Sequence, residues 1–171
     1  ATASVDISRA PTPAMLFPTH LLAAAVLGRR SRLSPLWLVV GTALPDVVDK
    51  PLATVGVVDL YHSVGHSALL VVLAVPVALA GRTGLALAVG WALHLLLDAL
   101  HVVLNGRPGD AIFLAWPLAV PTDPLAIPPG SFFLYYLGSP SFYLEVVFWL
   151  AVLGGLARAV WAGRSAWERG S

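Results

Sequence analysis

Formal charges are scarce in this sequence, and long apolar stretches separate them. Only 11% of the 171 residues are charged, whereas 58% are hydrophobic; a soluble domain usually carries about 25% charged residues. Charged side chains this few in number cannot cover the surface of an 18.0 kDa protein. We therefore expect membrane lipid to cover part of that surface. This excludes a soluble enzyme and a disordered chain. The net charge of +1 argues against a nucleic-acid partner.

Five charge-poor runs are candidate membrane segments of an all-α, polytopic membrane protein. They cover residues 10–28, 33–45, 67–81, 83–104 and 142–163. The first two are short for a full crossing, which needs roughly 20 apolar residues. We therefore predict about four to five membrane segments in a single helical domain over residues 15–171, preceded by a loose extension over residues 1–14.

Half of the 14 prolines fall between Arg107 and Pro140. Such a run cannot form a straight helix, because proline lacks the backbone N–H and clashes with the preceding turn. The segment is nevertheless apolar around Trp116. We predict a Pro-rich interfacial loop that could act as a lid over a site.

The arginines indicate how the segments are oriented. If five segments alternate across the membrane, one side carries seven arginines: Arg29, Arg30, Arg32, Arg82, Arg158, Arg164 and Arg169. The positive-inside rule makes that side cytoplasmic. We therefore expect an integral protein of the plasma (inner) membrane.

Histidine and aspartate residues recur toward the opposite, non-cytoplasmic ends of the segments. His94, Asp98 and His101 are spaced to share one helix face, and His62 and His66 would do so if the third helix begins by His62. An aspartate within an apolar span is unfavourable unless it is paired, and a cation would pair it. The predicted metal ligands are His20, Asp46, Asp49, His62, His66, His94 and Asp98.

Seven donors exceed the four positions of one tetrahedral zinc ion. Either two ions share them, or some of them orient the others. Nitrogen and oxygen donors with no cysteine in the chain favour zinc, with manganese or iron as alternatives. His101, Glu145 and Trp116 are candidates for a supporting role around the ligands. Any single histidine in such a segment is more often a packed side chain than a ligand.

Several short motifs occur in the order found in a known family. These are Thr19-His20, LPDVVD from Leu44 to Asp49, HSVGHS from His62 to Ser67, HLLLD from His94 to Asp98, and Trp116-Pro117. Over about residues 15–120 the chain resembles the membrane-bound metal-dependent hydrolases (YdjM-like, LexA-binding inner-membrane proteins). It departs from them at Lys50, where histidine is common, and at Gly65, where threonine is usual. The family is similar in ligand pattern to zinc-dependent phospholipase C, which implies a helical site and phosphoester hydrolysis.

Two functions from different classes follow. The first is a membrane-embedded hydrolase in which a metal-activated water attacks a phosphoester or a lipid-linked substrate, with Asp49 or Asp98 as general base. The second is a non-catalytic metal-binding membrane protein with a structural or sensing site. A transporter is less well supported, because no pair of repeats is visible in the sequence.

Overall fold

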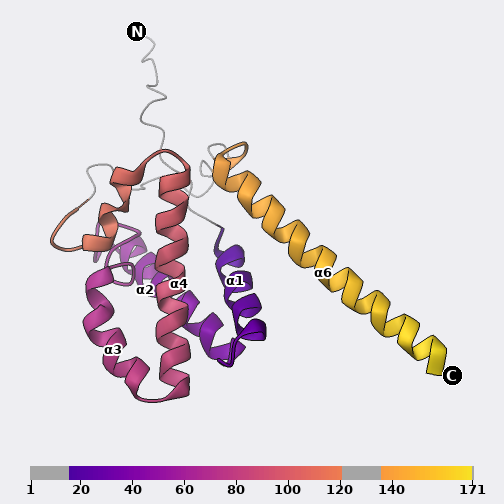
Figure 1. Cartoon of the computed structure of the whole chain (residues 1–171). Helices are drawn as coiled ribbons and strands as arrows, with labels where there is room; N and C mark the ends of the chain where they lie inside the picture. Colours follow the sequence, from indigo (N-terminus) through magenta and orange to yellow (C-terminus); the bar gives the residue numbers. More distant parts are fainter. Residues whose placement is uncertain (1–15, 121–135, 171) are drawn as a thin grey trace, which may run out of the picture.

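The computed structural model describes residues 16–120 and 136–170, and helices are the regular elements within these ranges. In chain order they are α1 (Phe17–Arg30), α2 (Pro35–Thr54), the 3-10 helix η2 (Ala68–Leu70), α3 (Val71–Leu79), α4 (Arg82–Leu104), the 3-10 helix η3 (Pro108–Ala115) and α6 (Pro140–Gly170). Figure 1 shows α1 to α4 gathered into one bundle, whereas α6 leans away from it. The all-α prediction is confirmed for the described residues.

Two helices are long and apolar enough to cross a membrane by length and composition. They are α4, with mean hydropathy 1.9, and the stretch Pro140–Arg164 of α6, with mean hydropathy 1.7. A core helix of a soluble protein can meet the same criterion, but the apolar window of α6 is 0% buried. Helix α1, with 14 residues, and the apolar stretch Ala68–Leu79 are too short to meet this criterion. Two of the predicted four to five membrane spans are therefore found among the described residues.

The second apolar run does not end where the sequence suggested. Helix α2 continues past Pro45 and contains Pro51 as well, ending only at Thr54. Each internal proline removes one backbone hydrogen bond and disfavours the helix. Packing outweighs that preference here, because the face of α2 that carries Asp46 and Asp49 is buried.

Helices α2 and α4 cross in close contact and form the centre of the bundle. The Thr42 hydroxyl donates a hydrogen bond to the Gly90 carbonyl over 2.8 Å. A Cβ atom at Gly90 would collide with the Leu38 carbonyl oxygen and would lie 2.9 Å from the Thr42 nitrogen. Glycine is therefore required at this crossing, which fixes the two helices relative to each other.

The Pro-rich region is only partly described. After α4 the chain forms η3, and Phe113 on this element is buried. Residues 121–135, which complete the predicted interfacial loop, lie outside the described residues, as does the predicted extension over residues 1–14.

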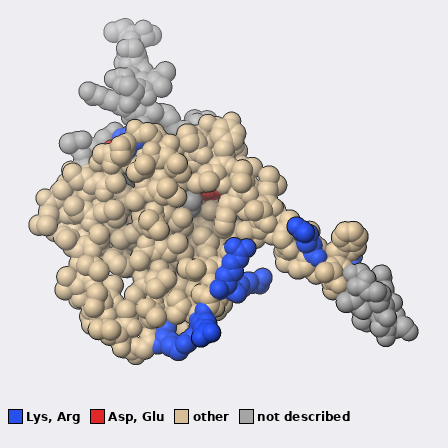
Figure 2. All heavy atoms as spheres, viewed as in Figure 1, with Lys and Arg blue, Asp and Glu red and all other residues tan. Residues whose placement is uncertain are grey.

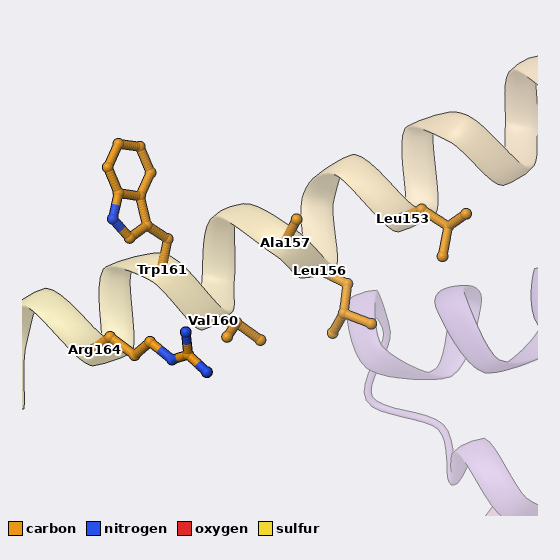
Figure 3. A pocket seen from close by; sticks show the side chains of 6 residues that line it. All are labelled: Leu153, Leu156, Ala157, Val160, Trp161 and Arg164. Atoms are coloured by element: carbon orange, nitrogen blue, oxygen red, sulfur yellow. The ribbon is translucent and has the colours of Figure 1, made fainter.

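Helix α6 corresponds to the final apolar run and extends beyond it at both ends. An open crevice of about 460 Å³ lies along its distal part and is lined by residues of this helix: Leu153, Leu156, Ala157, Val160, Trp161 and Arg164. Figure 3 shows Trp161 pointing to one side of α6, and Leu156 pointing to the other, toward the bundle. The distal part of α6 thus presents an uncovered apolar surface, as expected of a helix surrounded by lipid.

Substitution of Gly90 by alanine should destabilise the bundle. The added methyl group meets backbone atoms of α2, and overpacking of this kind costs about 1–3 kcal/mol. Thermal unfolding of the purified protein would show a lowered Tm. The matched control is Gly154→Ala on α6, where a Cβ atom meets nothing within 4 Å. Equal Tm values for the two variants would contradict the close crossing.

Candidate metal centre

Four segments that are distant in sequence bring histidine and aspartate side chains to one place. Helix α1 supplies His20, α2 supplies Asp46, and α4 supplies His94 and Asp98. The loop between α2 and η2 adds His62 and His66. Each of these side chains except that of His62 is in the buried class. Three overlapping groups of these residues have ligand atoms within 4.8 Å of one another, and the overlap indicates one shared centre.

Side-chain nitrogen and oxygen atoms of four residues lie close to one another in the middle of the cluster. His66 Nε2 lies 3.1 Å from His94 Nε2 and 3.4 Å from Asp98 Oδ2. His94 Nε2 lies 3.1 Å from the same Asp98 oxygen. Asp46 Oδ1 lies 3.6 Å from His66 Nε2 and 3.9 Å from His94 Nε2. Ligands bound to zinc at 2.0–2.1 Å in a tetrahedron are about 3.3 Å apart, so the atoms of His66, His94 and Asp98 are spaced as ligands of one ion, and Asp46 Oδ1 lies slightly farther from the two imidazoles.

His20 and His62 lie at the edges of this set and meet it through Asp98. His20 Nε2 is 3.1 Å from Asp98 Oδ1, and His62 Nε2 is 3.9 Å from Asp98 Oδ2. Asp98 Oδ2 itself is buried and has no hydrogen bond of acceptable geometry, despite the imidazole nitrogens around it. Buried polar atoms are normally satisfied. A buried carboxylate oxygen that faces several nitrogens without bonding to them is the arrangement that a cation would complete.

Asp49 lies behind His66 rather than in the middle of the cluster. Its Oδ2 is 2.7 Å from His66 Nδ1, the ring nitrogen opposite the one that faces the other donors. The backbone N–H groups of Ser63, Gly65 and His66 donate to the same carboxylate at 2.7, 2.7 and 3.2 Å. A carboxylate that holds the far nitrogen of a metal-binding histidine fixes its tautomer and ring orientation. This geometry assigns Asp49 an orienting role.

The loop that carries His62 and His66 is not helical, contrary to the expected start of the third helix. The hydrogen bonds to Asp49 explain this, because they wrap the backbone of residues 63–66 around one carboxylate. Gly65 makes the wrapping possible: a Cβ atom there would lie 2.8 Å from the Pro45 carbonyl oxygen. The loop is further held by Trp91, whose indole N–H donates to the Gly65 carbonyl at 2.9 Å.

The electrostatics of the cluster favour a cation. Three buried carboxylates, those of Asp46, Asp49 and Asp98, face one ammonium group, that of Lys50, which lies 2.7 Å from Asp46 Oδ2. Lys50 offsets one of the three negative charges and a proton on His66 offsets a second, so one buried negative charge is left over, which is strongly unfavourable. A divalent ion in place of that proton would neutralise the cluster.

The loop histidines respond to this environment in opposite directions. Burial lowers the pKa of His62 to about 4. Burial also disfavours the charged form of His66, but its hydrogen bond to Asp49 and the nearby carboxylates of Asp98 and Asp46 outweigh burial and raise its pKa to about 9. The carboxylates that stabilise a proton on His66 are the groups that would attract a metal ion to the same place.

Of the three residues predicted to support the ligands, Glu145 and His101 lie together, whereas Trp116 lies apart from them. Glu145 of α6 is buried, with Oε1 3.7 Å from His101 Nε2 and 3.0 Å from the Leu16 nitrogen. It also accepts a hydrogen bond from the hydroxyl of Thr19, the neighbour of His20. Trp116 contributes its backbone carbonyl, which accepts a hydrogen bond from Ser67 at 2.5 Å. Glu145 and His101 thus link α6 to the helices that carry His20 and Asp98.

Sequence reasoning gave no role to two residues of the site. Lys50 was considered only as a departure from the family pattern. In the structure its ammonium group forms an ion pair with Asp46, and its side chain is 50% exposed. Its i, i+4 spacing from Asp46 could have indicated this contact. The Phe113 ring lies 5.5 Å from the His62 ring and 6.2 Å from the His66 ring. No local signal in the sequence connects it to them.

No family model, curated protein or solved structure matches this chain.

Removal of His94 and Asp98 should abolish metal binding. Both supply atoms to the central set, so the double variant His94→Ala/Asp98→Ala leaves too few donors for a stable site. We expect about one equivalent of zinc in the gently purified wild type and none in the variant, measured by elemental analysis. Asp59→Ala, which removes an exposed loop carboxylate, should leave the metal content unchanged. A metal-free wild type would refute the site.

Asn substitution of Asp49 should weaken metal binding without abolishing it. Loss of a carboxylate that orients a ligand typically lowers metal affinity 10–100-fold. Titration against a chelator of known affinity would measure this change, with His94→Ala as the comparison. If Asp49→Asn abolishes binding as fully as His94→Ala, then Asp49 is itself a ligand.

Proposed function

We propose that this protein is a membrane-embedded, metal-dependent hydrolase that acts on a phosphoester or lipid-linked substrate. The observation that carries the proposal is the set of three overlapping histidine–aspartate groups, joined through His66, His94 and Asp98, inside an apolar helical bundle. The donors are nitrogen and oxygen only, which favours zinc over softer metals and leaves manganese and iron as alternatives. The family resemblance in the order of the motifs supports the same reading.

The chain's own residues divide the work of hydrolysis. A bound divalent ion supplies an acidified water and neutralises charge on a phosphoryl oxygen. Asp98 is the better candidate for the general base, because it borders the centre through Oδ2 while its second oxygen, Oδ1, lies 3.1 Å from His20 Nε2 and outside the middle of the cluster. Asp49 is less suited to take a proton, since both of its oxygens already accept hydrogen bonds. It acts through the orientation of His66 instead.

Lys50 is placed to bind the anionic part of a substrate. Its ammonium group lies beside Asp46 and 5.6 Å from the centre of the Phe17 ring, and half of its side chain is exposed. Binding of a phosphate by a lysine that borders a metal site is a recurrent arrangement, because the charge stabilises the developing negative charge.

The depth of the site favours a lipid-linked substrate. At 1.5 Å per residue, α4 is about 35 Å long, and His94 and Asp98 lie about 18 and 24 Å from its start. In a bilayer with a hydrocarbon core of about 30 Å, a centre at this level lies below the headgroups of the far leaflet. We place the protein in the plasma (inner) membrane as a polytopic protein, with its site toward the non-cytoplasmic side.

Hydrolysis should be detectable with zinc-loaded protein in lipid micelles. We expect phosphate or phosphoester release from a panel of phospholipids and lipid-linked phosphates, with kcat reduced by about 10²–10⁴-fold in Asp98→Asn, the size of a general-base contribution. Lys50→Met should raise KM more than it lowers kcat, since it removes a binding charge. An inactive, fully zinc-loaded wild type across the panel would rule out the hydrolase proposal.

The alternative is a structural or sensing metal site, and the near-complete burial of His20, His66 and His94 favours it. A structural ion contributes directly to folding free energy, so chelation should lower Tm strongly while the metal-loaded protein shows no turnover. A hydrolytic site would instead lose activity on chelation and regain it on metal addition. Activity and Tm measured on the same metal titration separate the two.

A further inference from the structure

The end of the bundle away from the metal centre carries a group of arginines. Arg29 and Arg30 end α1, Arg32 lies in the turn before α2, and Arg82 begins α4. All four side chains are exposed. Figure 2 shows Lys and Arg atoms gathered at the lower end of the molecule, where almost no Asp or Glu is visible on the same face. We refer to Arg29, Arg30, Arg32 and Arg82 as the arginine end.

The arginine end is held together without neutralising its charge. The Arg82 guanidinium donates to the Arg32 carbonyl, which joins the turn after α1 to the start of α4. The Ser31 hydroxyl accepts a hydrogen bond from the Leu33 nitrogen at 3.2 Å and stiffens the same turn. Across the described residues 16–120 and 136–164, no carboxylate forms an ion pair with any of the four arginines. Four exposed cations in one place are therefore available to anions from outside the chain.

Exposed apolar side chains lie near the arginines in the sequence. They favour a phospholipid over a free phosphate as the bound anion. Leu36 is 65% exposed, Trp37 is 38% exposed and Leu79 is 82% exposed, and they lie within five residues of Arg32 or Arg82 in the sequence. Tryptophan beside exposed leucines and arginines is typical of the level where headgroups meet acyl chains. A free phosphate would use the charges alone, whereas a phospholipid would use both the charges and the apolar border.

We propose that the arginine end binds the headgroups of anionic phospholipids in the leaflet opposite the metal centre. Each arginine near a membrane surface contributes about 1 kcal/mol to the attraction of anionic lipid, which corresponds to about fivefold in affinity. Bound headgroups would fix the height of α4 in the bilayer, and with it the depth of His94 and Asp98. This proposal does not depend on hydrolase activity.

The test uses the full chain in micelles that contain either phosphatidylglycerol or phosphatidylcholine, and native mass spectrometry counts the lipids retained per protein. We expect the wild type to retain phosphatidylglycerol preferentially. R29Q/R30Q and R32Q/R82Q should each lower the apparent affinity for it by roughly 25-fold. The control is R107Q, which removes an arginine at the opposite end of the bundle, where Asp110 already pairs with it, and it should leave the preference intact.

Three results would overturn the proposal. One is retention of phosphatidylglycerol by both arginine-end variants at the wild-type level. Another is an equal loss in the R107Q control, which would indicate a general charge effect. The third is displacement of the lipid by millimolar inorganic phosphate, which would indicate a phosphate site rather than a lipid site. Circular dichroism and a single size-exclusion peak establish that each variant is folded.

Discussion

Burial of three carboxylates inside an apolar helical bundle is the constraint on which the rest of the structure depends. Asp46, Asp49 and Asp98 are all in the buried class, and desolvation of so much charge is tolerated only where partners surround it. Imidazoles provide some partners and backbone N–H groups provide others. The three carboxylates differ in what remains unsatisfied, because Asp49 is saturated by hydrogen bonds whereas Asp98 Oδ2 has none of acceptable geometry. This difference distinguishes Asp49, which orients His66, from Asp98, which is available to a cation.

The backbone arrangement follows from holding these groups in place. The glycine crossing of α2 and α4 brings Asp46 to the level of His94, one turn beyond the Thr42–Gly90 contact. The loop after α2 then folds back on Asp49 instead of continuing into a helix. Glu145 connects α6 to α1 beside His20. Several of the polar contacts between elements therefore lie at the cluster or next to it.

The sequence was sufficient for the all-helical class, the bounds of α4 and the grouping of six of the seven predicted ligands, because apolar runs and i, i+4 spacings are local signals. It could not show that α2 continues through Pro45, since packing against α4 opposes the preference of proline. Nor could it separate Asp49 from the other donors. That distinction depends on a loop whose shape is set by contacts to residues 14 to 17 positions away. The contact of Lys50 with Asp46 could have been predicted from their i, i+4 spacing. The sequence analysis instead considered Lys50 only as a position where the resembled family often has histidine.

The distribution of the donors along the chain also bears on biogenesis. Within the described residues, the chain up to the end of α3 contains His20, Asp46, His62 and His66, whereas His94 and Asp98 arrive only with α4. During synthesis and insertion, an incomplete chain therefore lacks two atoms of the central set. The full set of candidate ligands therefore exists only after α4 has been inserted, and an ion that met the chain earlier would face a different set of atoms.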